Sequence, residues 1–387
     1  MLLRQSLTVV WNKSIGDKGE NGMNKIEEKR ELYWYWLTNI HGIGYQTIGK
    51  LLEQKETAEA IYFMNQKEMD YFFRTNQKEA FIKSRNWEEI RHQYEQLRQK
   101  NIQFYSREHR CFPMRLKNIP MAPYGIYVRG KLPNPYKKTI AIIGSRYSTA
   151  YGQEMAKYFA RELAKQGIIV ISGMARGIDS IAQNAALLAG GESYGVLGCG
   201  VDICYPIENF SLYEQLSQIG GILSEYPPNT KPKAGLFPMR NRLISGLADG
   251  VLIVEAKKRS GTLITVDWAL EQGKEIYAIP GRAFDALSEG CNHLIQMGAK
   301  LVTDIEDLAD DYGLESRDLS KNYENNQKTL AKNQRVVYSC LGLEPKYIDS
   351  IVNETKLSVQ EVLSALFELE MMDLIKQVVS NYYIVSK

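Results

Sequence analysis

The stretch from Thr139 to Gly200 places the strongest constraint on the fold of this chain. It contains three short apolar runs, each followed by a glycine turn, and helical patterns alternate with them. The runs are Thr139–Ile143, Ile168–Ile171 and Ser193–Leu197, and the turns are Gly144-Ser145-Arg146, Ser172–Gly177 and Gly198-Cys199-Gly200. Repetition of strand, glycine turn and helix predicts a parallel sheet. Its loops then lie at the carboxyl ends of the strands, where such sheets bind ligands.

Further apolar runs extend the predicted sheet: Gly221–Glu225, Gly250–Glu255 and Glu275–Ile279. The fold class is therefore α/β, with a Rossmann-like and mostly parallel core. Glycine lets a backbone approach a phosphate closely, and the free amides at a helix start attract anions. The pattern predicts a phosphate-binding edge.

Composition excludes several alternatives. The net charge of the 387 residues is only +3, so an argument about a polyanionic ligand has to rest on local charge. The five cysteines form no C-x-x-C pair and the four histidines are scattered, so we expect neither a disulfide framework nor a metal site. No apolar run has the length of a membrane span. We expect a cytoplasmic protein without cofactors.

Changes in pattern divide the chain into five predicted segments. They are a disordered tail or wrongly assigned start (1–22), a helical domain (23–105), the Rossmann-like domain (106–312), a polar linker (313–332) and a winged-helix domain (333–387). In the helical domain, Leu37–Gly44 resembles a helix-hairpin-helix, whose amides hold a DNA phosphate. A plain turn between two helices fits it equally well. Gly44–Lys50 has P-loop spacing but lacks the Ser or Thr and the preceding strand, so we reject that interpretation.

The C-terminal segment has the pattern of three helices and a hairpin. Ser358 and Glu361 form a predicted capping box at the start of the second of the two helices that make up the helix-turn-helix. Such a helix usually enters the DNA major groove. Here it has three glutamates and no lysine or arginine, and residues 333–387 contain five basic and seven acidic residues. We therefore favour a protein contact over a DNA contact for this domain.

Basic residues gather instead in the predicted loops of the central domain. Residues 231–242 contain four cations and no acidic residue, and Lys257-Lys258-Arg259 precedes another glycine-containing helix start. If these loops converge on one edge, they form a groove for a polyanion, where an aromatic side chain can stack on a base. The alternative is a set of unrelated surface charges. The predicted DNA-binding residues are Gly144, Ser145, Arg146, Gly173, Arg176, Gly177, Lys233, Phe237, Arg240, Asn241, Arg242, Lys257, Ser260 and Gly261.

At these residues the chain resembles the DNA-processing protein family DprA, also called Smf. The resemblance extends from Phe112-Pro113 through Gly281 and on to the winged helix. Its motifs include Gly144-Ser145-Arg146, Ser172–Asp179, Tyr205-Pro206, Ser224-Glu225, Phe237–Arg242, Glu255-Ala256, Ser260–Thr265 and Pro280-Gly281. The resemblance implies a protein of natural transformation that binds incoming single-stranded DNA, loads the RecA recombinase onto it and acts as a homodimer. It also implies a DNA pocket centred on Arg146.

The chain departs from the family pattern at two positions. Gln183 stands where the family usually has His, and Ile207 where it often has Lys. Both changes remove polar or basic character from the expected pocket and predict a lower affinity for DNA.

A nucleotide-binding or nucleotide-hydrolysing enzyme is the alternative function. Asp179, Glu225 and Glu255 are expected near strand ends, where a general acid or nucleophile would stand. No paired-carboxylate spacing, metal-ligand cluster or Ser-His-Asp set can be assembled, however. Asp179 is more simply a helix-start partner, and the two glutamates would hold Arg240 or Arg242. We therefore expect binding without catalysis.

Overall fold

The computed structural model describes residues 25–314, 330–342, 344–372 and 374–385. The chain has two compact units. The first ends at Phe112 and takes in Ala122–Val128, and the second takes in Pro113–Met121 and the chain from Arg129 onwards. The predicted tail (1–22) and most of the predicted linker (313–332) lie outside the described residues.

The first unit is mainly helical, as predicted, and also contains strands. Its elements are α2 (Lys25–Asn39), α3 (Tyr45–Lys55), α4 (Ala58–Tyr62), α5 (Gln66–Phe72), α6 (Thr75–Ser84), α7 (Trp87–Gln99), β1 (Ile102–Ser106) and most of β2 (Gly125–Gly130). The hairpin between α2 and α3 is braced by α6, since Gln77 Nε2 donates to the Gly42 carbonyl at 3.0 Å. A helix precedes Gly44–Lys50, which agrees with the rejection of a P-loop.

A buried carboxyl group joins α2 to β1 in this unit. Glu31 is 3% exposed, and its two oxygens accept from the Ser106 hydroxyl at 2.6 Å and the Ser106 amide at 3.1 Å. Burial raises the pKa of Glu31 to about 7, although these hydrogen bonds partly oppose the shift.

The raised pKa of Glu31 predicts a loss of stability between pH 4.5 and about 7. In this range the folded state keeps a proton that the unfolded state has released, so stability falls as the pH rises. The Glu31→Gln variant should lack this dependence, and the free-energy gap between variant and wild type should change by on the order of 3 kcal/mol. Thermal unfolding of both proteins across this range measures it, and parallel profiles would contradict it.

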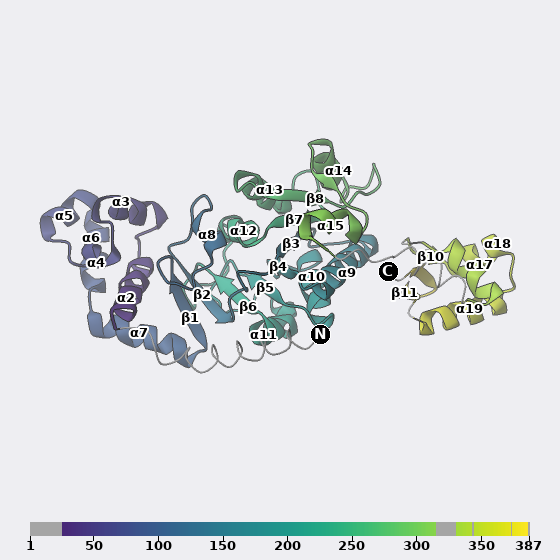
Figure 1. Ribbon diagram of the computed structural model, residues 1–387, viewed down its shortest axis with the longest axis horizontal. Helices are drawn as coiled ribbons and strands as arrows, with labels where there is room; N and C mark the ends of the chain where they lie inside the picture. The colour runs from purple at the N-terminus through teal and green to yellow at the C-terminus, as the bar shows by residue number, and fades with distance from the viewer. Residues whose placement is uncertain (1–24, 315–329, 343, 373, 386–387) are drawn as a thin grey trace, which may run out of the picture. The chain divides into compact units, whose positions relative to one another are not determined.

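The second unit contains the predicted parallel sheet. Its elements before the winged helix are α8 (Met114–Lys117), β3 (Thr139–Ile143), α9 (Ala150–Lys165), β4 (Ile169–Ser172), α10 (Ile178–Leu188), β5 (Ser193–Val196), η1 (Ile207–Asn209), α11 (Phe210–Ile219), β6 (Gly221–Ser224), α12 (Leu236–Leu247), β7 (Gly250–Ile253), α13 (Gly261–Glu271), β8 (Glu275–Ala278), α14 (Glu289–Gln296), β9 (Lys300–Leu301), η2 (Ile305–Leu308) and α15 (Ala309–Tyr312). Seven strands run parallel in the order β6-β5-β4-β3-β7-β8-β9 (Figure 1).

The burial and packing of β3 agree with its central place in the sheet. Every residue of β3 is buried, as expected for a central strand that is covered on both faces. Ile140 and Ile142 pack in one cluster with apolar residues of α9 and α10. Helices α12 and α13 pack against each other outside this cluster. The fold is the predicted Rossmann-like α/β class.

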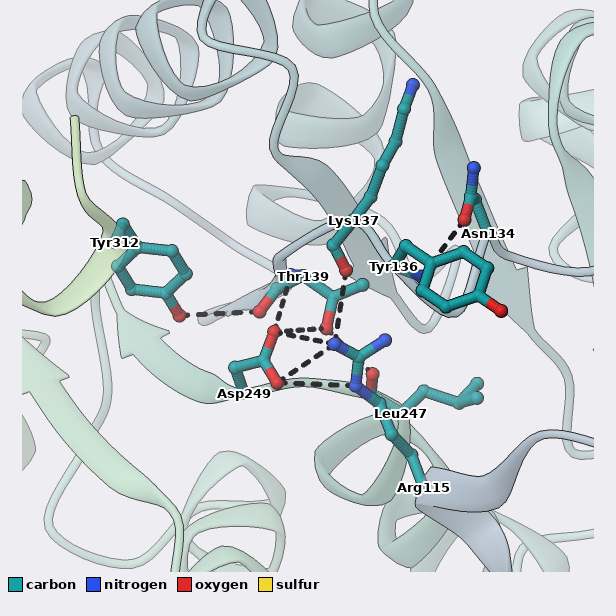
Figure 2. Close-up of polar contacts among 8 residues, drawn as sticks. All are labelled: Arg115, Asn134, Tyr136, Lys137, Thr139, Leu247, Asp249 and Tyr312. Atoms are coloured by element: carbon teal, nitrogen blue, oxygen red, sulfur yellow. Dashed lines mark hydrogen bonds and ion pairs between the residues drawn. The ribbon is translucent and has the colours of Figure 1, made fainter. Parts of the chain in front are cut away.

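A polar network holds the amino-terminal ends of β3 and β7 together (Figure 2). The Asp249 carboxylate accepts from the Thr139 amide at 2.8 Å and from Arg115 Nη2 at 3.0 Å. Arg115 Nη2 also donates to the Lys137 carbonyl at 3.1 Å, and the Tyr312 hydroxyl donates to the Thr139 carbonyl at 3.3 Å. One carboxylate thus joins α8 to two central strands.

Replacement of Asp249 should destabilise the second unit. Asp249→Ala leaves the Arg115 guanidinium and the Thr139 amide without their shared acceptor, and charge-assisted hydrogen bonds are the stronger kind. We expect a loss of about 2 kcal/mol in unfolding free energy, measured by urea denaturation. Asp310→Ala, at an exposed position of α15, is the matched control and should change little. Equal effects of both substitutions would contradict the assigned role.

The C-terminal part has the predicted winged-helix elements. They are α17 (Lys332–Cys340), β10 (Lys346–Tyr347), α18 (Ile348–Thr355), α19 (Val359–Met371), β11 (Ile375–Val379) and β12 (Tyr382–Val385). The three strands pair in the order β10-β12-β11, and an apolar cluster joins the helices to them. The predicted capping box is present, because Ser358 Oγ accepts from the Glu361 amide while Glu361 accepts from the Ser358 amide.

Candidate nucleic-acid interface

The loops after β3, β4 and β7 meet where the strand order reverses. β3 lies between β4 and β7, so successive connections leave it in opposite directions along the sheet. This is the position at which open α/β sheets bind ligands. The β3 loop contacts the start of α13, since Thr262 Oγ1 donates to the Gly144 carbonyl at 3.3 Å. It is also held from β7, because Glu255 accepts from the Thr149 amide at 3.1 Å.

Gly177 brings the β3 and β4 loops into direct backbone contact. It has φ +76°, and a Cβ there would lie 2.3 Å from the Ser145 carbonyl oxygen and 2.8 Å from that of Arg146. The next amide, of Ile178, donates to the same Ser145 carbonyl at 3.2 Å. Only glycine satisfies both the backbone conformation and the approach. The first two of the three predicted glycine turns are therefore adjacent in space.

Gly177→Ala should destabilise the protein more than an alanine at Gly190. Both glycines have nearly the same positive φ, +76° and +78°, but no atom lies within 4 Å of a Cβ built on Gly190. Gly177 also has ψ −131°, so alanine there would meet both the clash with the β3 loop and a backbone conformation that it rarely adopts. We expect a difference of about 2 kcal/mol or more in unfolding free energy, measured by denaturant titration. Equal losses would show that the loop contact has little energetic weight.

Arg146 is the exposed cation of the β3 loop. Its side chain makes no hydrogen bond or ion pair with any residue that the structure describes, and neither its amide nor that of Ser145 donates to an acceptor there. Ser145 Oγ accepts from the Tyr147 amide at 3.1 Å and so shapes the turn. Two unused amides beside an unpaired guanidinium are the groups that bind an oxyanion.

Arg176 of the β4 loop is also exposed but is paired with Glu208. Both side chains are about half exposed, so the pair adds little stability and can open at small cost. Arg176 can thus exchange its carboxylate partner for a phosphate.

Two predicted phosphate contacts need correction. Arg240 is only 5% exposed; its Nη1 donates to the Gly173 carbonyl at 2.8 Å and also bonds the Val196 carbonyl. Burial lowers its pKa to about 10, while the charge of Asp179 opposes this shift, so it stays charged at neutral pH. Arg240 therefore joins β4 and β5 from inside, because α12 turns this position toward the sheet and away from the surface.

Arg242 is the second correction, with an exposure of 1%. Its Nη2 donates to both oxygens of Glu225, at 2.6 and 2.8 Å, as the sequence suggested for a glutamate at this strand end. Burial raises the pKa of Glu225, and Arg242 partly opposes the shift. This ion pair is internal and does not face a ligand.

Phe237 stands at the predicted edge with an aromatic neighbour. Its ring centroid lies 5.6 Å from that of Tyr205, at an interplanar angle of 33°. Gly198 leaves room for the ring, since a Cβ there would lie 2.8 Å from Phe237 Cδ1. Tyr205 is 45% exposed and so offers a stacking surface.

The remaining predicted residues surround this edge. Lys233 and Lys257 are exposed and form no ion pair with the described residues. Asn241 Nδ2 donates to the Gly261 carbonyl at 3.5 Å, and Gly261 begins α13. The Ser260 hydroxyl precedes that helix and is buried without a hydrogen-bond partner among the described residues. The helix start therefore has polar groups that its own structure leaves unused.

The two departures from the family pattern differ in consequence. Gln183 is fully buried, accepts from the Met174 amide at 3.1 Å and donates to the Tyr194 carbonyl at 3.0 Å. It supports the β4 loop from behind. Ile207 is 68% exposed, so at this position the chain presents an apolar surface.

The carboxylates of the alternative, enzymatic hypothesis hold the loops. Asp179 is 7% exposed and accepts from the Gly173 amide at 3.1 Å, and burial raises its pKa. Glu255 is 3% exposed, accepts from both the amide and the hydroxyl of Thr149, and also has a pKa raised by burial. Among the described residues, no three His, Cys, Asp or Glu side chains gather as a metal site.

The predicted site omits two aromatic side chains, Tyr205 and Phe284, and one residue that supports the β4 loop, Asn209. Tyr205 belongs to the Tyr205-Pro206 motif, but the motif does not indicate that its ring contacts that of Phe237. Phe284, between β8 and α14, is fully exposed beside a loop that contacts the Lys257 segment, since Ala256 donates to the Leu287 carbonyl at 2.8 Å. Asn209 donates to the Met174 carbonyl at 2.8 Å. For Phe284, the sequence offered one signal, an aromatic residue shortly after the Pro280-Gly281 motif.

Comparison with known proteins agrees with this arrangement. The sequence matches the family described as DNA recombination-mediator protein A over residues 103–313 and the DprA winged helix domain over residues 323–379. The chain belongs to the DprA family. No helix that the structure describes combines the length and apolar character needed to cross a bilayer.

Individual DprA relatives cover most of the chain between them. Protein Smf of Escherichia coli is 37% identical over 292 residues, which are 74% of this chain and 78% of that protein. DNA processing protein DprA of Bacillus subtilis is 41% identical over 198 residues, 51% of this chain and 67% of its own length. The X-ray structure of DprA from Streptococcus pneumoniae superposes with a TM-score of 0.64 at 32% identity, covering 74% of this chain and 99% of that one.

Proposed function

We propose that this DprA family member binds single-stranded DNA at the carboxyl edge of its parallel sheet, protects it, and loads the RecA recombinase onto it during natural transformation. The observation that supports DNA binding most directly is the unpaired, exposed Arg146 beside two unused backbone amides. Membership of a family described as a recombination mediator supports the later step.

Binding would use the backbone and cations for phosphates and rings for bases. The amides of Ser145 and Arg146, the Arg146 side chain and the exposed Lys233 and Lys257 contact phosphates. The Phe237–Tyr205 pair stacks on a base. Phosphate contacts contain no sequence information, so binding is largely independent of sequence.

The cellular context is part of the same proposal. A DprA protein that receives incoming DNA works in the cytoplasm, and we propose a homodimer as its active form. Its partners are then single-stranded DNA and RecA. We assign no catalytic role, because Asp179 and Glu255 each hold a neighbouring loop through hydrogen bonds from backbone amides.

Arg146→Ala should weaken binding of oligo-dT at least tenfold, because the proposed site loses its unpaired guanidinium. Lys138→Ala is the matched control: Lys138 is also exposed, but it precedes β3 at the opposite edge of the sheet. Fluorescence anisotropy across a salt series measures both, and wild-type affinity should fall steeply with salt through counterion release.

Two results would contradict the proposed site. If Lys138→Ala weakens binding as much as Arg146→Ala, general surface charge explains the affinity. If the wild type ignores oligo-dT at low salt but turns over nucleotides, the enzymatic alternative is correct.

A further inference from the structure

One face of α19 has exposed apolar side chains, and all the charged residues of this helix are acidic. Val359, Leu363, Phe367 and Met371 recur every four residues and therefore lie along one side of the helix. They are 54%, 46%, 65% and 72% exposed. We refer to these four residues as the α19 stripe.

The stripe is distinct from the face that folds the domain. Val362, Ala365, Leu366 and Leu369 are nearly fully buried in the winged-helix core. The helix is thus apolar on two sides, although one side suffices to hold it in the domain. Contiguous exposed apolar surface of this kind marks interaction sites.

The charges around the stripe indicate which partner fits. The charged residues of α19 are Glu361, Glu368 and Glu370, and the helix has no lysine or arginine. Helical periodicity places Glu370 on the side of the stripe and the other two beyond its Met371 border. Hydrogen bonds from Ser358 lower the pKa of Glu361, so it stays ionised at neutral pH. A DNA backbone would be repelled by this helix, and a second copy would bring like charges together.

We infer that the α19 stripe is a docking surface for a basic protein partner, one that offers an apolar groove or ridge bordered by lysine or arginine. Side chains at every fourth position act as anchors in such helix-mediated contacts. Phe367 and Leu363 are the main anchors, because they lie at the centre of the stripe and hot spots cluster near the centre of an interface. This surface functions independently of the DNA-binding edge.

A pair of peptides tests the chemistry of the partner with the full-length chain. Both are amphipathic helices with the same leucine face, one flanked by lysines and the other by glutamates. The lysine peptide should bind with an affinity that falls with salt, and the double variant Leu363→Gln/Phe367→Gln should bind it about tenfold more weakly. Val379→Gln, at an equally exposed apolar position of β11, is the control and should bind like wild type.

The outcomes that would overturn the inference are distinct. Equal binding of both peptides would indicate nonspecific hydrophobic binding. Absence of lysine-peptide binding up to millimolar concentration would show that α19 has no such site. Loss of duplex DNA binding in the double variant would make α19 a groove-reading helix. Loss of self-association in sedimentation velocity would make a second copy the occupant. Unchanged thermal unfolding of the variant, expected because both side chains are exposed, excludes misfolding as the cause.

Discussion

The backbone contact between the β3 and β4 loops is the constraint on which the proposed DNA-binding edge depends. Gly177 approaches the Ser145 carbonyl more closely than any side chain would allow, and that carbonyl also receives the first amide of α10. The β3 turn is thereby fixed, and the amides of Ser145 and Arg146 in it donate to no acceptor among the described residues. The backbone of Arg146 is held in this turn, so less conformational entropy is lost when its side chain binds a ligand.

Behind the turn lies a layer of buried charge. Arg240 sits between Asp179 and the carbonyls of Gly173 and Val196, while Arg242 is held by Glu225. The Arg240 guanidinium is bonded to backbone carbonyls, whereas Arg242 Nε and Nη1 are buried without a hydrogen-bond partner among the described residues. Removal of Glu225 would leave the buried charge of Arg242 uncompensated. The basic character of residues 231–242 therefore divides into an exposed part, with Lys231 and Lys233, and an internal part that maintains the shape of the loops.

The elements of the α/β core could be predicted because their signals are local. Apolar runs such as Thr139–Ile143 and Gly250–Ile253 became strands, and the glycine turns after them lie where the sheet edge places them. The burial of Arg240 and Arg242 could not be predicted, because it depends on which side of α12 faces the sheet. The Tyr205–Phe237 pair could not be predicted either, since its rings come from a loop and from the first turn of α12, 32 residues apart. The local sequence pattern predicts whether a segment forms a helix or a strand, whereas tertiary contacts decide what each side chain faces.

The exposed pair of Arg176 and Glu208 has a consequence for how ions accompany binding. If DNA binds at the proposed site and a phosphate replaces Glu208 at Arg176, the DNA gives up a condensed cation, while the freed carboxylate attracts cations in return. The exchange would then release fewer ions than a contact made by an unpaired cation, and the buried Arg240 and Arg242 would take no part in it. The number of ions released on binding is therefore smaller than the number of basic residues in the loops. A count of lysines and arginines in the sequence would overstate it.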